Sequence, residues 1–223
     1  MSRRLVIWDV DGTLVDSAGE IAVIMSRAFS DDGLDAPALA AVRGTIGLTL
    51  PVAFERLHPG LGEKRLAHLT HLYRHHSRRH REESGLGGSP LFPGIRTTLE
   101  SLAQGGETHL AVATGKSFQS LMPILDGHGL TEMFASIQVS DDHPSKPHPS
   151  MVFAAMAETG AAPARTVMVG DTSFDMDMAR AAGVAALAVS WGYHPAETLS
   201  ADAVAHDAGE LPTLISRLAG DWP

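Results

Sequence analysis

Apolar residues follow two different patterns along the chain, and these patterns predict two kinds of structure. Short runs of strand length, rich in apolar residues, are strand candidates at residues 5–8, 110–113, 136–139, 166–169 and 186–189. Runs of this length, bounded by turn residues, are typical of strands buried on both faces of a parallel sheet. From residue 95 onward, segments with apolar residues at helical spacing alternate with these runs, at residues 95–103, 117–128, 150–158 and 174–182. The alternation predicts an α/β fold with a doubly wound, Rossmann-like parallel sheet.

The segment between the first two strands has apolar residues at helical spacing only. One stripe runs from Ile21 to Phe29, with Asp16 and Ser17 before it as candidate N-cap residues. Further helices are predicted at residues 38–43, 50–57 and 63–83, and the glycine-rich stretch 84–90 is predicted to be a flexible return connection. We therefore expect an all-helical cap domain at residues 15–90, inserted into an α/β core of residues 1–14 and 91–223.

Composition narrows the class of protein without changing this picture. The 223 residues are 44% hydrophobic and 19% charged, with a mean hydropathy of +0.02, which is typical of a soluble globular protein. No apolar run approaches the ~20 residues needed to cross a bilayer, and a net charge of −9 argues against a general nucleic-acid surface. The sequence has no cysteine, which excludes disulfides and thiol catalysis. We expect a cytoplasmic monomer or small homo-oligomer that binds neither nucleic acid nor membrane.

Chemically reactive side chains follow three of the predicted strands. Asp9 and Asp11 follow the first strand, Thr114 follows the second, and Asp171 follows the run at 166–169, while Lys146 lies in a loop between two of these strands. Ligands of open parallel sheets gather at the carboxyl ends of the strands. Each residue has an ordinary alternative: a polar turn for the aspartate pair, a helix cap for Thr114 or Asp171, and a solvated lysine. Their coincidence at strand ends favours a functional site.

These residue types suit the transfer of a phosphoryl group to a carboxylate and then to water. Asp9 is the candidate nucleophile, and Asp11 is the candidate general acid and then general base. Two like charges so close together need a cation or a shared proton. Asp9, Asp171 and the backbone carbonyl of Asp11 are therefore predicted to be ligands of Mg²⁺. Asp175, one helical turn further on, is predicted to orient the waters of the metal.

The phosphate itself needs donors and a balancing charge. Thr114 and the backbone N–H groups that follow it, including that of Gly115, are predicted to hold phosphate oxygens at a helix N-terminus. Lys146 is predicted to be the cation that balances the phosphate and the nucleophile.

Taken together, the motifs resemble those of the haloacid dehalogenase superfamily of hydrolases with a helical cap. The matching motifs are Asp9-Val10-Asp11-Gly12-Thr13, Thr114-Gly115-Lys116, Lys146-Pro147 and Gly170-Asp171-Thr172 with Asp175, in the order of the family. The stretch Val189-Ser190-Trp191-Gly192-Tyr193-His194 further resembles phosphoglycolate phosphatases. The resemblance implies an aspartyl-phosphate mechanism and a cap that closes over a small phosphorylated metabolite.

Other activities of this superfamily fit the sequence less well. The dehalogenases and the phosphonate hydrolases lack the second aspartate, which Asp11 supplies here, and the sugar-phosphate mutases carry a histidine near the position of Ile21. We therefore expect a phosphatase that hydrolyses a small phosphate monoester, with phosphoglycolate as the leading candidate. The alternatives are another phosphohydrolase acting on a sugar phosphate, nucleotide or pyrophosphate, a phosphomutase, or a non-catalytic binder of a phosphorylated ligand.

Substrate selectivity is expected to come from the cap. Arg43, at the entry to the glycine-rich loop 44–47, is the candidate for gripping an anionic tail of the substrate, and a surface arginine that ends a helix is the alternative. The histidines from His68 to His80 are interpreted as a solvated basic helix face rather than as a metal site.

Overall fold

The computed structural model describes residues 3–84, 89–104 and 106–220 and contains the predicted parallel sheet. Its strands are β1 (Arg4–Trp8), β2 (Thr108–Ala113), β3 (Phe134–Gln138), β4 (Thr166–Gly170), β5 (Ala185–Val189) and β6 (Ala203–Ala205). They lie in the order β3-β2-β1-β4-β5-β6, and every neighbouring pair is parallel. The predicted fold class is confirmed.

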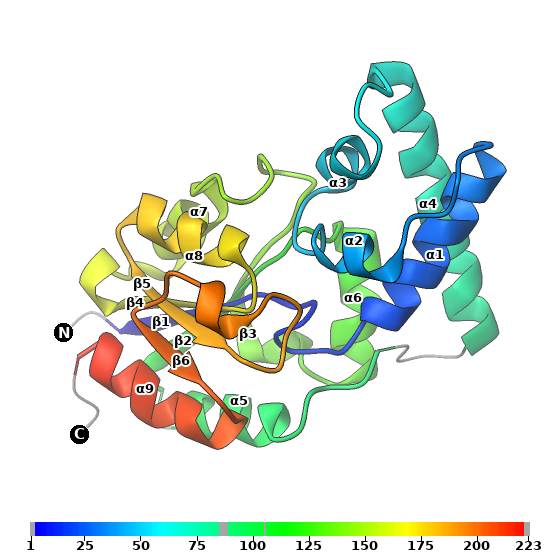
Figure 1. The fold of residues 1–223 in the computed structure, drawn as a ribbon. Helices are drawn as coiled ribbons and strands as arrows, with labels where there is room; N and C mark the ends of the chain where they lie inside the picture. Colours follow the sequence, from blue (N-terminus) through cyan, green and yellow to red (C-terminus); the bar gives the residue numbers. More distant parts are fainter. Residues whose placement is uncertain (1–2, 85–88, 105, 221–223) are drawn as a thin grey trace.

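Helices cover both faces of the sheet (Figure 1). Those of the α/β part are α5 (Ile95–Ala103), α6 (Phe118–Gly127), α7 (Ser150–Thr159), α8 (Ser173–Ala182) and α9 (Leu211–Leu218). Side chains alternate along β1, because successive residues of a strand point to opposite faces. Val6 and Trp8 join the cluster under α5, α6 and α9, and Leu5 and Ile7 join the cluster under α7 and α8.

The chain leaves the adjacent strands β1 and β4 toward opposite faces of the sheet. After β1 it continues through the helical segment to α5 on one face, whereas after β4 it continues directly into α8 on the other. A crevice forms at such a switch point, outside the carboxyl ends of the strands, and this is where ligands of open α/β sheets bind. Asp9 and Asp171 stand immediately after these two strand ends.

Four helices form a layer beside the sheet, α1 (Ala18–Asp31), α2 (Leu39–Arg43), α3 (Leu50–Leu57) and α4 (Glu63–Ser84) (Figure 1). This helical layer has a hydrophobic cluster of its own, in which the ring of Phe54 contacts Phe29 at 5.9 Å and Tyr73 at 6.3 Å between centroids. Among the described residues, Tyr193 is the one member of that cluster from outside the layer. None of the described helices is long and apolar enough to cross a membrane.

The two connections between the layer and the sheet run side by side. Val15 pairs with Leu91 in an antiparallel bridge, and the N–H of Asp16 donates to the carbonyl of Pro90 at 2.9 Å. These contacts coincide with the domain limits expected from the sequence, although the division into two domains stays a prediction. Most of the predicted flexible connection lies outside the described residues, which stop at 84 and resume at 89.

Sequence patterns missed the C-terminal part of the fold. No element was predicted after residue 189, yet β6 and α9 follow there. β6 has only three residues, too few to show an alternating pattern. Helix α9 carries a readable signal, with Pro212 in its first turn and buried Leu211 and Ile215 on one face. The predicted strand at 136–139 also starts two residues late, because Phe134 begins β3.

We predict that Phe54→Ala destabilises the helical layer without destabilising the sheet, provided the layer is a separate domain. Phe54 is fully buried, and replacing such a ring with alanine costs about 3–5 kcal/mol. Hydrogen exchange should show faster exchange of amides in α1 and α4, with protection in β1 and β4 retained. Phe153→Ala on the surface of α7 should change neither region, since Phe153 is 48% exposed. An equal loss of protection in both regions would show that the layer and the sheet unfold as one unit.

Candidate active site

Three buried carboxylates meet at the ends of β1 and β4. Strand pairing aligns Trp8 with Val169, and the N–H of Asp9 extends that pairing by donating to the carbonyl of Val169 at 2.9 Å. Asp9 and Asp171 are thereby brought together, and Asp175 joins them from the first turn of α8. The three residues are fully buried, and one oxygen from each lies within 4.8 Å of the others. Among the described residues, no other group of this kind has a metal-binding arrangement.

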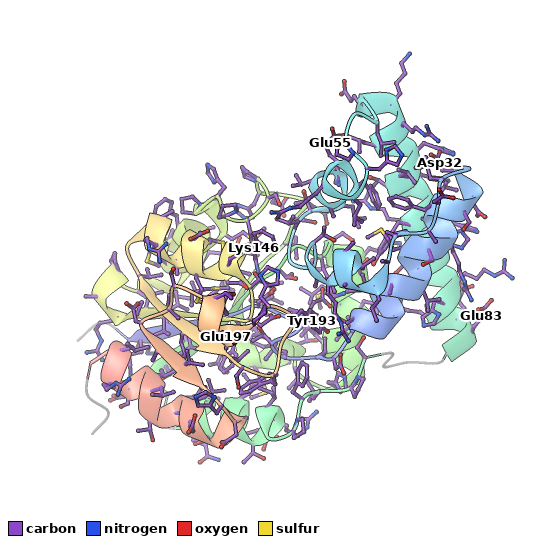
Figure 2. The ribbon with its side chains drawn as sticks, viewed as in Figure 1. Asp32, Glu55, Glu83, Lys146, Tyr193 and Glu197 are labelled. Atoms are coloured by element: carbon purple, nitrogen blue, oxygen red, sulfur yellow. The ribbon has the colours of Figure 1, made fainter. Side chains whose placement is uncertain are left out.

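Lys146 lies inside this carboxylate cluster. Its Nζ donates to Oδ1 of Asp175 at 2.7 Å and stands 2.9 Å from Oδ1 of Asp9, and its side chain is fully buried. Burial opposes the charged form of Lys146, but Asp175 and Asp9 outweigh it and raise the pKa of the ammonium group. Lys146 therefore stays charged, as its predicted role requires. Figure 2 places it on the side of the core that faces the helical layer.

One lysine does not neutralise three carboxylates. Burial raises the pKa of Asp9 to about 7, with Lys146 opposing the shift and Asp175 and Asp11 adding to it. Burial also raises the pKa of Asp171 well above its usual range, and the charges of Asp9 and Asp175 add to that shift. Like charges held this close in a dry site are relieved by protons or by a cation.

The space around Asp171 suits a small divalent cation. Carboxylate oxygens are the ligands that Mg²⁺ prefers, and Oδ2 of Asp9 has no hydrogen-bond partner among the described residues. A side chain at Gly12 or Gly192 would collide with the Asp171 carboxylate, and Gly12 has a φ of +85° that other residues rarely adopt. The donors present therefore fit Mg²⁺. The carboxylate of Asp11 is not part of the cluster, so its predicted contribution rests on its backbone carbonyl and stays a prediction.

Asp175 is fixed by the start of α8. Its Oδ2 accepts hydrogen bonds from the backbone N–H of Thr172 at 3.1 Å and from the hydroxyl of Thr172 at 2.7 Å, so that the two residues form a capping box. The side chain thus links the helix N-terminus to Lys146. It belongs to the carboxylate cluster directly, which makes it a possible metal ligand as well as the predicted support of the metal's waters.

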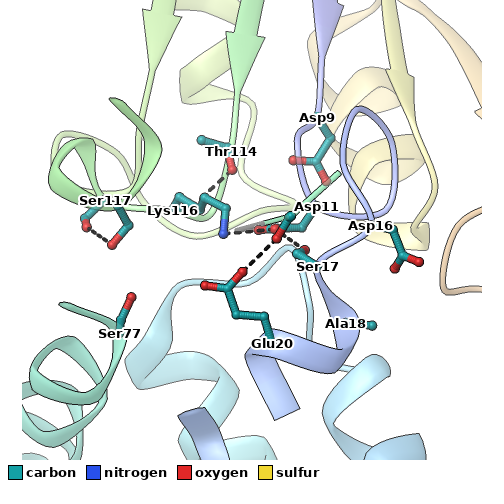
Figure 3. A network of polar contacts seen from close by, with 12 residues as sticks. Asp9, Asp11, Asp16, Ser17, Ala18, Glu20, Ser77, Thr114, Lys116 and Ser117 are labelled. Atoms are coloured by element: carbon teal, nitrogen blue, oxygen red, sulfur yellow. Dashed lines mark hydrogen bonds and ion pairs between the residues drawn. The ribbon is translucent and has the colours of Figure 1, made fainter. Parts of the chain in front are cut away.

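Asp11 stands beside the cluster and is held by two other residues (Figure 3). Its Oδ1 accepts a hydrogen bond from the hydroxyl of Ser17 and lies 2.9 Å from Nζ of Lys116. Ser17 occupies the predicted N-cap position of α1, but its side chain makes no cap hydrogen bond because the hydroxyl turns to Asp11. The sequence predicted only a helix cap for Ser17, and it assigned neither Ser17 nor Lys116 to the active site.

The predicted phosphate-binding residues lie after β2, although not at a helix N-terminus. Helix α6 begins at Phe118 with Ser117 as its N-cap residue, so Thr114 and Gly115 belong to the loop before the helix. The Thr114 hydroxyl accepts a hydrogen bond from the N–H of Lys116 at 3.2 Å. A side chain at Gly115 would lie 2.6 Å from the carbonyl oxygen of Gly47, which shows how closely the helical layer approaches this loop.

A cavity of about 810 Å³ opens between the helical layer and the strand ends. From the sheet side, Asp11, Gly115 and Lys116 line it. The buried side chains of Asp9 and Lys146 are not among its lining residues, so they lie behind this inner wall. A ligand in the cavity therefore meets Asp11 and Lys116 before it reaches the carboxylate cluster.

Comparison with known proteins identifies the family. The profile of the family described as "Haloacid dehalogenase-like hydrolase" matches residues 6–189, which is most of the chain. The chain belongs to this family. Its motifs at the ends of β1, β2 and β4 lie within the matched region, as the sequence resemblance implied.

Curated relatives of this hydrolase cover almost its whole length. It is 40% identical over 204 residues to "Probable phosphatase IndB" of Dickeya dadantii, covering 89% of this chain and 86% of the relative. It is 33% identical over 220 residues to a "Phosphoglycolate phosphatase" of Agrobacterium fabrum, covering 96% and 93%. A solved structure of a predicted phosphoglycolate phosphatase from Haemophilus somnus superimposes with a TM-score of 0.81 at 25% identity, covering 96% of this chain and 98% of that one.

Arg43 lies away from the cavity of the hydrolase. It is the last residue of α2, its side chain is exposed, and it is not among the lining residues. Two other arginines of the helical layer, Arg74 and Arg81 of α4, do line the cavity. The geometry does not support the predicted role of Arg43 in reading the substrate, and that role stays a prediction.

The histidines of α4 are not uniformly solvated. His76 is buried, and its Nε2 lies 2.7 Å from Oδ2 of Asp31, so it joins α4 to the end of α1. The interpretation as a solvated face is therefore wrong for His76. The described histidines form no group that could hold a metal.

Tyr193 connects the start of the helical layer to the carboxylate cluster. Its hydroxyl accepts hydrogen bonds from the backbone N–H groups of Ser17 at 2.7 Å and Ala18 at 2.9 Å, which are the first free donors of α1. Its own backbone N–H donates to Oδ2 of Asp171 at 2.8 Å. Figure 2 shows Tyr193 on the same side of the core as Lys146. The sequence signal was the resemblance of residues 189–194 to phosphoglycolate phosphatases, which gave no role.

We predict that Tyr193→Phe lowers the free energy of unfolding by about 1–2 kcal/mol, because two N–H groups at the start of α1 lose their acceptor. Tyr73→Phe is the matched control, since these are the two tyrosines of the chain and the described residues offer the Tyr73 hydroxyl no hydrogen bond. It should cost less than about 0.5 kcal/mol. Urea denaturation of both variants measures the difference, and equal losses would contradict the capping role of Tyr193.

The raised pKa of Asp9 predicts how the stability of the metal-free protein depends on pH. Between the ordinary value of 3.8 and about 7, the folded state holds a proton on Asp9 that the unfolded state has released. The free energy of unfolding therefore falls as pH rises through this window. Denaturation in EDTA at pH 5 and pH 7 should show a larger loss for the wild type than for Asp9→Asn, which cannot titrate. Parallel behaviour of the two proteins would contradict the assignment.

Proposed function

We propose that this hydrolase is a Mg²⁺-dependent phosphatase that cleaves a phosphate monoester through an aspartyl-phosphate on Asp9. The observation that carries the proposal is the buried cluster of Asp9, Asp171 and Asp175 around Lys146, at the switch point of the sheet and behind a cavity. Phosphoryl transfer needs an aligned nucleophile together with cations around the phosphate oxygens. Both requirements are supported by these side chains.

In the first step, a carboxylate oxygen of Asp9 attacks phosphorus, and the bond from phosphorus to the ester oxygen breaks. Asp11 gives a proton to the leaving alcohol. In the second step, Asp11 takes a proton from a water that attacks the phosphorus of the aspartyl-phosphate, so that phosphate and the Asp9 carboxylate are released. The position of Asp11 on the cavity wall, between Ser17 and Lys116, supports both duties.

The phosphate oxygens are proposed to be held by residues of two loops. Lys146, the Thr114 hydroxyl and the N–H of Gly115 are the proposed donors from this chain. Asp9, Asp171 and the backbone carbonyl of Asp11 are the proposed ligands of Mg²⁺, with Asp175 beside them. When bound, the ion supplies positive charge that offsets the carboxylates and the phosphate.

The substrate is proposed to be a small phosphorylated metabolite in the cytoplasm. Phosphoglycolate is the candidate that the resemblance of residues 189–194 supports, together with the names of several relatives. A non-catalytic role is disfavoured, because a protein that only binds a phosphorylated ligand needs neither Asp9 nor Asp11.

We predict that Asp9→Asn abolishes hydrolysis of an aryl phosphate in Mg²⁺, because an amide is a poor nucleophile, and that EDTA abolishes the activity of the wild type. Acid quenching during turnover should leave a phosphate on the peptide that contains Asp9, detected by mass spectrometry in the wild type only. Asp177→Asn on the exposed side of α8 is the control and should retain full activity, since Arg180 at the surface is the one ion-pair partner of Asp177 among the described residues. Substantial turnover by Asp9→Asn would exclude the proposed nucleophile.

A further inference from the structure

The cavity has a volume of about 810 Å³ although the helical layer already contacts loops of the α/β part. The backbone N–H of Thr49 donates to the hydroxyl of Ser145 at 3.0 Å, and Nη2 of Arg74 lies 3.4 Å from Oδ1 of Asp141. Each contact joins the layer to a loop of the α/β part. The cavity volume is therefore the volume left between the two parts when they are already in contact. Pockets of ~300–1,000 Å³ hold drug-sized ligands, and a two-carbon acid such as glycolate is far smaller.

Aliphatic side chains make up much of the cavity wall. Ile21, Ile24 and Met25 of α1 line one side, and Ile124 of α6 also lines the cavity. A leaving group covered with hydroxyls would lose water against these side chains without gaining hydrogen bonds, which is costly. A flat ring with apolar faces would instead gain free energy by covering them. The wall therefore favours a ring over an open polyhydroxylated chain.

One face of α4 supplies several of the polar groups that line the cavity, in addition to those of the sheet side and the loops. Tyr73, Ser77 and Arg81 line it, and their spacing of four residues places them on the same side of the helix. Nη1 of Arg81 donates to the Ser77 hydroxyl at 3.0 Å, and Arg81 makes no ion pair with a described carboxylate. The Tyr73 hydroxyl likewise has no hydrogen bond within the described structure. Burial and the nearby Asp11 and Glu20 carboxylates raise the pKa of Tyr73, which keeps it a neutral donor.

We infer that the leaving group is a nucleoside, so that the substrate is a nucleoside monophosphate whose base carries a carbonyl oxygen for Arg81. This inference rests on the proposed phosphatase activity and names its substrate class. The base lies between the aliphatic side chains of α1 and α6, and Arg81 and Tyr73 donate to its polar edge. Arg81, rather than Arg43, is then the arginine that determines specificity.

The test compares four phosphate esters by kcat/KM: uridine 5′-monophosphate, ribose 5-phosphate, phosphoglycolate and an aryl phosphate. Uridine 5′-monophosphate should be preferred over phosphoglycolate and over ribose 5-phosphate by at least about tenfold. Arg81→Met should lower kcat/KM for uridine 5′-monophosphate by about 10- to 100-fold, the effect of losing a hydrogen bond from a charged donor, and should lower it less for phosphoglycolate. Arg78→Met is the matched control, because Arg78 is an exposed arginine of α4 outside the cavity wall.

Binding gives a second readout that does not depend on turnover. Asp9→Asn protein should bind uridine 5′-monophosphate more tightly than phosphoglycolate in calorimetry, and adding Arg81→Met should remove most of that difference. Preference for phosphoglycolate or ribose 5-phosphate would overturn the inference and leave the phosphatase intact. A loss of selectivity in Arg43→Met but not in Arg81→Met would also overturn it. Failure to hydrolyse any of the four esters, the aryl phosphate included, would instead overturn the proposed phosphatase.

Discussion

The burial of three carboxylates around one lysine is the constraint on which the rest of the structure depends. Asp9, Asp171 and Asp175 are all removed from water, and an unpaired charge in such a place is strongly destabilising. Lys146 offsets part of the charge. The remaining negative charge has to be balanced by a proton or a cation. The raised pKa of Asp9 shows that a proton is held there more readily than on an ordinary aspartate. The proposed Mg²⁺ site would offset this excess negative charge.

The same constraint extends to the start of the helical layer. Tyr193 contacts Asp171 through its backbone and the start of α1 through its hydroxyl, and Ser17 at that start contacts Asp11. The first turn of the layer is thus linked through Tyr193 to Asp171 of the cluster, and through Ser17 to Asp11, the proposed general acid. The position of α1 is therefore coupled to the positions of Asp171 and Asp11.

The sequence predicted those parts of the molecule in which a local residue pattern also determines where the residues lie in the fold. A buried strand followed by a polar residue gave both the sheet and the places of Asp9, Thr114 and Asp171, because parallel strands end at one edge. The structure places Lys146 beside Asp9 and Asp175, while its role toward phosphate stays a prediction. The ion pair of Lys116 with Asp11 joins two loops that lie far apart in the sequence. No local pattern predicts such a contact. Nor did any pattern predict β6, whose three residues pair only at the edge of the sheet.

The arginines show why selectivity was harder to predict than chemistry. Arg43 stands beside a glycine-rich loop in the sequence, but its place at the end of α2 leaves its side chain exposed. Arg81 directly follows the stretch from His68 to His80 that was interpreted as a solvated basic face, and tertiary packing decides which residues of α4 line the cavity. The reactive side chains of the sheet are positioned by the ends of strands, and strand ends can be predicted from the sequence. The rotation of α4, by contrast, depends on how its Leu69 packs into the hydrophobic cluster that contains Phe54 of α3, and this packing decides which α4 side chains face the cavity.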